Sequence, residues 1–176
     1  MKKYAIRLSY LLGFALMLSS CNDYSSTVPI SNESHSKIDS VYIGLWRFMP
    51  TTELGLNKEK FENHLLEVFP FNDHEYVIRM YNQDDDQIFA RGFLSTINHT
   101  KYANVQILNF NSTEYYLYKT HVEADTLWHY PINKKVFNEQ FKNSKKLFKA
   151  IYKHQSDSGF FETPLKYIRV KRNKLY

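Results

Sequence analysis

After residue 40 the chain is a succession of short β-favouring segments, each closed by proline or by a cluster of polar turn residues. The clearest pattern lies in residues 102–108, where an apolar residue at every second position alternates with polar Asn104 and Gln106. This alternation is typical of a strand with one buried face and one solvated face. We predict strands in the ranges 41–48, 65–69, 75–81, 87–97, 102–108, 114–122 and 126–130.

The pattern becomes helical near the C-terminus. Asn143 or Ser144 can cap a helix, because either side chain accepts a hydrogen bond from a free backbone N–H group. Residues 165–171 then indicate a last strand. The sequence therefore predicts a mainly β fold, an antiparallel small barrel or sandwich, with one C-terminal helix and a closing strand. The helix has an apolar face that comprises Leu147, Phe148, Ile151 and Tyr152.

The N-terminus has the layout of a secretory signal peptide. Three basic residues precede an apolar run from Leu8 to Leu18, which is shorter than the roughly 20 residues that span a bilayer as a helix. Leu18-Ser19-Ser20-Cys21 follows and resembles the lipobox of bacterial lipoproteins. The resemblance implies that the Cys21 thiol takes a diacylglycerol, that the signal is cut before it, and that the new amino group is acylated. An ordinary cleaved signal and an uncleaved anchor are the alternatives.

The resemblance also implies a membrane address. Asn22 follows Cys21, whereas aspartate at that position resembles the inner-membrane retention signal of some bacterial lipoproteins, so the outer membrane of the bacterial envelope is favoured. Cys21 is the single cysteine of the chain, which excludes an internal disulfide. Loss of Lys2, Lys3 and Arg7 with the signal would lower the formal net charge from +5 to +2, so charge gives no argument for nucleic acid.

Three regions follow from these patterns. Residues 1–20 are the expected signal peptide, and residues 21–40 are the expected lipidated cysteine with a flexible Ser/Asn/Thr-rich tether. Residues 41–176 have the size of a single β-rich domain. At its end, the basic run 166–174 is interpreted as a strand with one solvated basic face, and contact with anionic lipid headgroups is the alternative.

Gly44-Leu45-Trp46 lies near the start of the first predicted strand of this domain. It resembles the Gly-x-Trp opening of lipocalins. The resemblance implies a barrel whose base is filled by Trp46, with a helix late in the chain.

Aromatic residues cluster in the predicted strands, and alternation in the 114–122 strand predicts Tyr115 on one face with Tyr116 and Tyr118 on the other. Core packing explains most such clusters. A ligand cavity inside a barrel, or an exposed partner-binding face, would use the same residue types. The residues considered for ligand or partner binding are Trp46, Tyr115, Tyr116, Tyr118, Trp128 and Tyr130.

No sequence motif indicates catalysis. The chain has no Gly-x-Ser-x-Gly elbow and no glycine-rich phosphate loop. His121, Asp125 and His129 have a spacing that suits metal ligands on a helix, but this region is predicted as strand, so we expect no metal site there. The Asp84–Asp86 run lacks the spaced ligands of a calcium loop and is interpreted as an acidic turn. We therefore expect no catalytic residue, cofactor or metal.

The sequence thus predicts a lipid-anchored accessory protein of the bacterial envelope that binds without catalysis. Its partners would be the membrane, through the N-terminal lipid, and an envelope protein, as in an assembly factor, an inhibitor or an immunity-type lipoprotein. A lipocalin-like carrier of a small apolar ligand is the first alternative, and an envelope enzyme without a recognisable motif is the second. A protein-binding module predicts an exposed aromatic patch and a filled barrel, whereas a carrier predicts an enclosed aromatic cavity.

Overall fold

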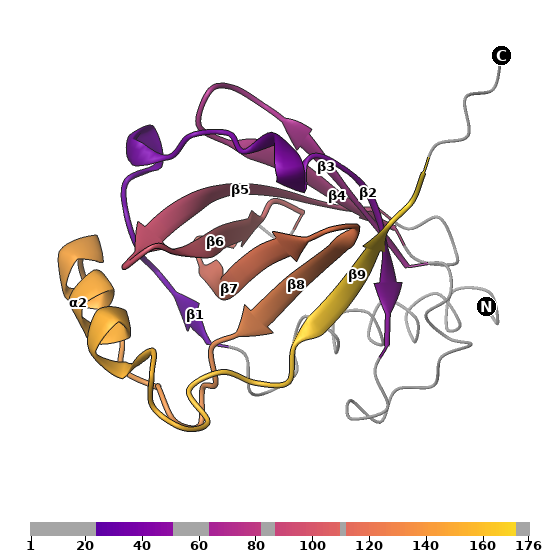
Figure 1. Ribbon diagram of the computed structural model, residues 1–176. Coiled ribbons are helices and arrows are strands. Elements are labelled where there is room, and N and C mark those ends of the chain that lie inside the picture. The colour runs from indigo at the N-terminus through magenta and orange to yellow at the C-terminus, as the bar shows by residue number, and fades with distance from the viewer. Residues whose placement is uncertain (1–23, 51–63, 82–86, 110–111, 172–176) are drawn as a thin grey trace, which may run out of the picture.

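The alternating sequence pattern produces eight antiparallel strands that close into a barrel (Figure 1). These strands are β2 (Gly44–Met49), β3 (Leu65–Pro70), β4 (Tyr76–Tyr81), β5 (Gln87–Ile97), β6 (Thr100–Ile107), β7 (Tyr115–Glu123), β8 (Thr126–Pro131) and β9 (Leu165–Arg169). Each strand from β2 to β8 pairs with the next along the chain, and β9 closes the ring between β8 and β2. The computed structural model describes residues 24–50, 64–81, 87–109 and 112–171. The predicted mainly β, lipocalin-like architecture is confirmed, and it takes the form of a barrel.

The barrel interior is an apolar core formed by one face of each strand. Residues that pair across neighbouring strands share a face, so Trp46 of β2 and its partner Leu66 of β3 both point inward. The buried residues of this core are Tyr42, Trp46, Leu66, Val68, Tyr76 and Leu127.

In the described part of the chain one α-helix, α2 (Ser144–His154), packs against the outside of the barrel, as Figure 1 shows. Its N-terminus is capped by Asn143, whose side chain accepts a hydrogen bond from the Lys146 amide at 3.0 Å. The predicted helix and its cap are therefore confirmed.

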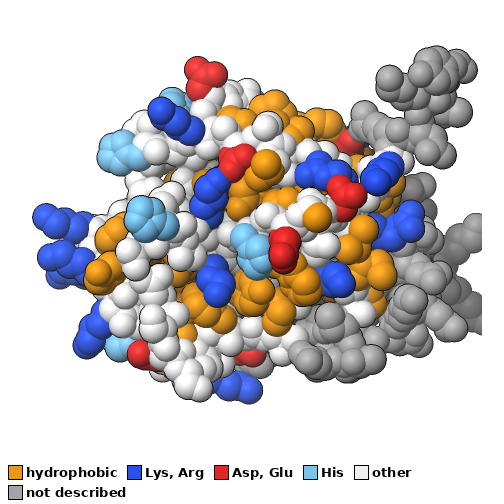
Figure 2. Space-filling view, viewed as in Figure 1, with side chains coloured by type: hydrophobic (Ala, Val, Ile, Leu, Met, Phe, Trp, Pro, Cys, Tyr) orange, Lys and Arg blue, Asp and Glu red, His pale blue; other side chains and the backbone are white. Residues whose placement is uncertain are grey.

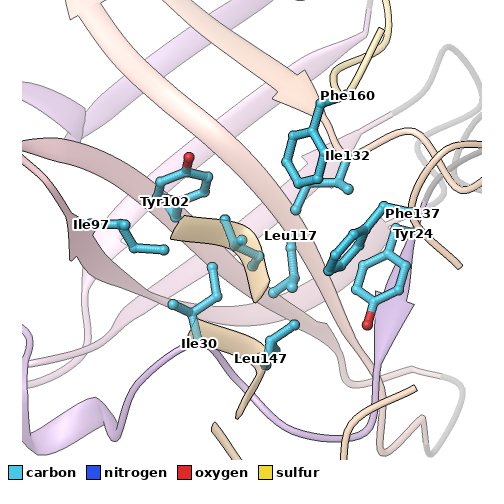
Figure 3. Packing of buried hydrophobic residues seen from close by; sticks show 10 residues of the cluster. Tyr24, Ile30, Ile97, Tyr102, Leu117, Ile132, Phe137, Leu147 and Phe160 are labelled. Atoms are coloured by element: carbon cyan, nitrogen blue, oxygen red, sulfur yellow. The ribbon is translucent and has the colours of Figure 1, made fainter. Parts of the chain in front are cut away.

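The buried face of α2 is narrower than the sequence predicts. Leu147 and Ile151 are fully buried in one apolar cluster with Ile97 and Leu117 of the barrel wall. Figure 3 shows Leu147 among these side chains. Tyr152 is instead 56% exposed, because the buried stripe of this helix runs through Leu147 and Ile151, four residues apart. Tyr152, which the sequence places on the apolar face of the helix, therefore lies outside the buried stripe.

The segment before the barrel is part of the fold, so the prediction of a flexible tether up to residue 40 is wrong for residues 24–40. Strand β1 (Ser25–Ser26) pairs with β7 outside the ring. Tyr24 and Ile30 are 1% exposed and belong to the same outer core as α2. The segment continues through two 3-10 turns, η1 (Glu33–His35) and η2 (Ser40–Tyr42), into β2.

Polar contacts explain why this segment packs without a periodic apolar pattern. The Ile30 amide donates to Oδ1 of the buried Asn104 at 2.8 Å, and the Ser31 and Ser95 hydroxyls lie 2.6 Å apart. The Ser36 hydroxyl accepts from the Leu94 amide at 3.1 Å. Widely spaced anchors of this kind order an extended chain without the alternation of a strand.

The expected signal peptide and Cys21 lie outside the described residues. Within the part of the chain that the structure describes, no helix is long and apolar enough to cross a membrane.

Arg169 and Trp46 close one end of the barrel, which we call the base. The Trp46 ring is fully buried, and its Nε1 donates to the Tyr42 carbonyl at 2.9 Å. The Arg169 guanidinium lies 4.0 Å from the centroid of that ring and donates to the carbonyls of Ile43 and Val41, at 2.8 and 2.6 Å. Trp46 thus fills the base, as the lipocalin resemblance implies.

Steric constraints explain why the first residue of the Gly44-Leu45-Trp46 motif is glycine. Gly44 has φ +141°, a conformation that other L residues rarely adopt. A Cβ atom at this position would lie 2.9 Å from Nη1 of Arg169. Glycine therefore lets the guanidinium reach the Trp46 ring.

Candidate ligand-binding cavity

The barrel contains an apolar cavity of about 140 Å³ above the base. Tyr42 and Tyr76 line it near the base, and His64 and Leu165 line it toward the opposite end, where β2 ends and β3 begins. We call this opposite end the rim. Aliphatic residues from β3 to β6 complete the walls. The aromatic residues of the lining are Tyr42, Phe48, Tyr76, Tyr81, Tyr116, Tyr118 and Tyr167, and Phe93 borders the cavity with its ring turned to the outer side.

Two polar side chains face this cavity from paired positions of β7 and β8. Thr120 pairs with His129 in the register of the two strands, and both line the cavity. Thr120 is 2% exposed, and its hydroxyl has no hydrogen-bond partner among the described residues. An unpaired buried hydroxyl costs about 1–3 kcal/mol, so a ligand that reached it with a polar group would recover that free energy.

His129 is enclosed within the barrel and uncharged at neutral pH. Burial lowers its pKa from 6.5 to about 4. The ring stacks on Tyr118 with centroids 5.5 Å apart and lies at the same distance from Tyr167. His129 can therefore exchange a hydrogen bond with a ligand but brings no positive charge into the cavity.

The strand geometry separates His121, Asp125 and His129. His121 is exposed on the outer face, next to the inward-facing Thr120, whereas His129 lines the cavity. Asp125 lies in the turn between β7 and β8 and forms ion pairs with Arg169 at 3.8 Å and Lys171 at 3.5 Å. Within the described ranges no three His, Cys, Asp or Glu residues are grouped to hold a metal ion. The Asp84–Asp86 run lies outside those ranges.

The aromatic residues singled out in the sequence do not form one site. Trp46 fills the base, and Tyr116 and Tyr118 line the cavity. Tyr115 lies on the outer side of β7, where its ring contacts Phe93 at 6.2 Å. The opposite faces that the sequence predicts for Tyr115 and Tyr116 follow from strand alternation.

Trp128 and Tyr130 belong to an aromatic row on the outer face of β7 and β8. The His121 ring stacks with both of them, at 6.4 and 5.8 Å between centroids. Lys166 lies over Trp128 at 5.3 Å, and Lys119 lies over Tyr130 at 4.5 Å. Figure 2 shows hydrophobic side chains gathered over β8 and β9 with Lys and Arg among them.

Sequence reasoning missed Thr120 as a lining residue and Arg169 as part of the base. Thr120 lies two residues after Tyr118, so strand alternation alone places it on the same face as Tyr116 and Tyr118. Pairing of Thr120 with His129, however, depends on the register that the turn at Ala124, with φ 50°, imposes on β7 and β8.

Comparison with known proteins gave no match to a family model, to a curated protein or to a solved structure. Functional inference therefore rests on the fold, the cavity and the N-terminal sequence.

Proposed function

We propose that this protein is a lipid-anchored binding protein of the bacterial envelope whose barrel takes a small, mainly apolar molecule without transforming it. The observation that carries the proposal is the apolar cavity in the closed barrel, with one unpaired buried hydroxyl, that of Thr120, on its wall. Concave, mostly apolar sites with a few placed polar groups are the usual form of small-molecule sites.

The size of the cavity limits the ligand. A dry cavity of roughly 150 Å³ accommodates benzene, whereas drug-sized ligands occupy about 300–1,000 Å³. At about 140 Å³ the barrel suits a single ring or a short alkyl chain.

The polar groups of the cavity limit its chemistry. The Thr120 hydroxyl and the uncharged His129 ring favour a ligand with one hydroxyl group. An ionised carboxylate is disfavoured, because none of the described residues that line the cavity is a lysine or arginine that would offset its desolvation.

Binding of phenol and toluene to the purified protein tests this site, with calorimetry as the readout. Thr120→Val should weaken phenol binding about five- to tenfold, which corresponds to the loss of one hydrogen bond, and should leave the affinity for toluene unchanged. Thr126→Val is the matched control, because Thr126 pairs with Glu123 away from the cavity lining. Ala103 lines the cavity, so the larger side chain of Ala103→Leu should fill it and abolish the binding of both phenol and toluene. Unchanged binding in that variant would place the ligand elsewhere and contradict the proposal.

The membrane address is tested separately. Lipidation adds a diacylglyceryl and an acyl mass at Cys21, and about 0.8 kcal/mol of anchoring per buried CH₂. Mass spectrometry of the membrane-extracted protein should find these masses, with loss of residues 1–20, in the native chain and not in Cys21→Ala. An unmodified mature chain would refute the anchor.

A protein-binding function is the second candidate, and the outer aromatic row favours it. Trp128 and Tyr130 are half-buried, so part of each ring remains available to a partner. Tyr and Trp commonly dominate the binding energy of protein interfaces. Crosslinking from Thr126, which shares this face, to an envelope protein would support this candidate, provided that Trp128→Ser prevents the crosslink.

A further inference from the structure

Residues 134–153 carry an unusual concentration of positive charge. They contain seven lysines and one acidic residue, Glu139, a net charge of +6, whereas the whole chain has a formal net charge of +5. In Figure 2, Lys and Arg side chains project at the left, the side on which α2 lies in Figure 1. The lysines are Lys134, Lys135, Lys142, Lys145, Lys146, Lys149 and Lys153.

These lysines are available for binding. All seven are exposed, and none forms an ion pair with another described residue. Two large apolar side chains, Val136 at 53% and Tyr152 at 56%, are exposed among them. We call the exposed side chains of residues 134–153 the Lys-rich surface. Lysines mixed with exposed aliphatic and aromatic groups suit the interface of a bilayer.

The Lys-rich surface lies directly beside the start of the described chain. The Tyr24 hydroxyl donates to the Glu139 carbonyl at 2.7 Å, and its ring meets the Phe137 ring at 5.0 Å. Gln140 adds a hydrogen bond from its Nε2 to the Ser25 carbonyl at 3.3 Å. Tyr24 is therefore fixed against the backbone that carries the lysines.

Chain length then limits how far the anchor can be. Cys21 precedes Tyr24 by three residues, which span at most about 11 Å when fully extended. Because residues 24–40 pack on the barrel, no long tether separates a lipid on Cys21 from the folded domain. A bilayer that held this lipid would lie within reach of the Lys-rich surface.

We propose that the Lys-rich surface binds the anionic phospholipid headgroups of the leaflet that holds the Cys21 lipid. This inference rests on the proposed lipidation of Cys21. A polybasic surface beside a lipid chain is attracted to anionic headgroups, and each lysine adds to the attraction. The contact between the Lys-rich surface and the headgroups would fix the orientation of the barrel relative to the membrane. A lipid chain alone leaves that orientation free.

The location of the contact distinguishes it from the basic C-terminal run. Lys171 pairs with Asp125 near the base. Tyr24 lies instead near the rim, because β1 pairs with Tyr115 and Tyr116 at the start of β7, and the Tyr24 amide donates to the Ile132 carbonyl just after β8. The contact therefore turns the side of the barrel that carries Tyr24 and α2 toward the leaflet, away from the Asp125–Lys171 pair.

The test uses the full lipidated chain in vesicles of phosphatidylcholine, with or without phosphatidylglycerol. Lipidation blocks the Cys21 thiol, so Tyr152→Cys provides a single site for an environment-sensitive fluorophore. Phe71→Cys is the matched probe, because Phe71 is 67% exposed and lies in the turn after β3 near the base. A blue shift of the Tyr152 probe, and not of the Phe71 probe, is expected only with phosphatidylglycerol.

Charge reversal provides the decisive comparison. Lys146→Glu with Lys149→Glu should abolish the shift, whereas Lys37→Glu with Arg47→Glu, at exposed positions elsewhere, should retain it. Circular dichroism checks that each variant is folded. An unshifted Tyr152 probe on lipidated protein, or a shift that survives the Lys146 and Lys149 reversal, overturns the proposal and makes an acidic protein the better occupant. An unmodified Cys21, detected by mass, overturns the anchor itself, so the two failures are distinguishable.

Discussion

The Arg169 guanidinium lies 4.0 Å from the centroid of the Trp46 ring and joins the first and last strands of the barrel at its base. The same guanidinium satisfies the carbonyls of Ile43 and Val41, which belong to the entry into the first strand. One side chain therefore stabilises both the closure of the ring and the packing of the turn that precedes it.

Arg169→Ala should lower the free energy of unfolding by about 2–4 kcal/mol, because it removes a cation–π contact and two charged hydrogen bonds. Urea denaturation measures the change. Arg47→Ala, at an exposed position of the same β2 strand, is the control and should stay within about 0.5 kcal/mol of the native protein. Equal effects of the two substitutions would show that Arg169 does not hold the base.

Gly44→Ala should destabilise the protein by about 1–3 kcal/mol, since its positive φ disfavours a side chain and the new Cβ meets Arg169. Part of this loss should disappear when Arg169→Ala is already present, because only the backbone strain then remains. A double-mutant cycle in urea measures this coupling. Strictly additive losses would contradict the contact between the Gly44 position and the guanidinium.

Asn104→Ala should release the segment that precedes the barrel. Asn104 is fully buried, and its Oδ1 accepts from the Ile30 amide, so truncation leaves that N–H unpaired at a cost of about 1–3 kcal/mol. Hydrogen exchange should accelerate at residues 28–36 more than in β3. Asn138→Ala, at an exposed position without a side-chain hydrogen bond in the described chain, is the control. Fast hydrogen exchange of residues 28–36 in the native protein would instead mean that this segment is a flexible tether.

His129 should make the protein less stable in mild acid. Its pKa is about 4 in the folded state, against 6.5 in the unfolded chain, so the unfolded chain binds more protons between these values. The contribution of His129 to stability is therefore complete above pH 6.5 and is lost as pH falls from 6.5 to 4, about 3 kcal/mol in all.

Replacement of the His129 imidazole tests whether this residue causes the loss of stability between pH 6.5 and 4. His129→Phe should flatten the stability profile between pH 4 and 6.5 in urea titrations. His121→Phe, on the exposed outer face, is the matched control for the change from imidazole to phenyl. A slope that survives in His129→Phe would assign the acid sensitivity to another group.

Much of the fold could be predicted because strand alternation is a local signal. The polar positions at Asn104 and Gln106 identify a strand, and alternation correctly separates Tyr115 from Tyr116. Local pattern could not reveal that Asn104 is buried on its polar face, because the Ile30 backbone that covers it lies far away in the sequence. This covering segment was predicted as a tether for the same reason.

The candidate site depended even more on long-range geometry. Sequence placed Tyr116 and Tyr118 on one face of a strand but could not show that this face lines a cavity. The position of the lysines around α2 was visible in the sequence, whereas their contact with Tyr24 arises only when residues 137–140 pack against the N-terminal segment.

Thr120→Val separates the stability of the empty barrel from its capacity to bind. Valine has nearly the shape of threonine and removes a buried hydroxyl that has no partner in the described chain, so the free energy of unfolding should rise by about 1 kcal/mol or remain unchanged. Thr126→Val, away from the cavity, is the control for the change in side-chain type. Thermal unfolding without ligand measures both. A loss of more than about 1 kcal/mol in Thr120→Val alone would mean that the hydroxyl is paired within the folded chain. The preference for a hydroxylated ligand would then lose its structural basis, whereas unchanged or increased stability together with weaker phenol binding would assign the Thr120 hydroxyl to the ligand.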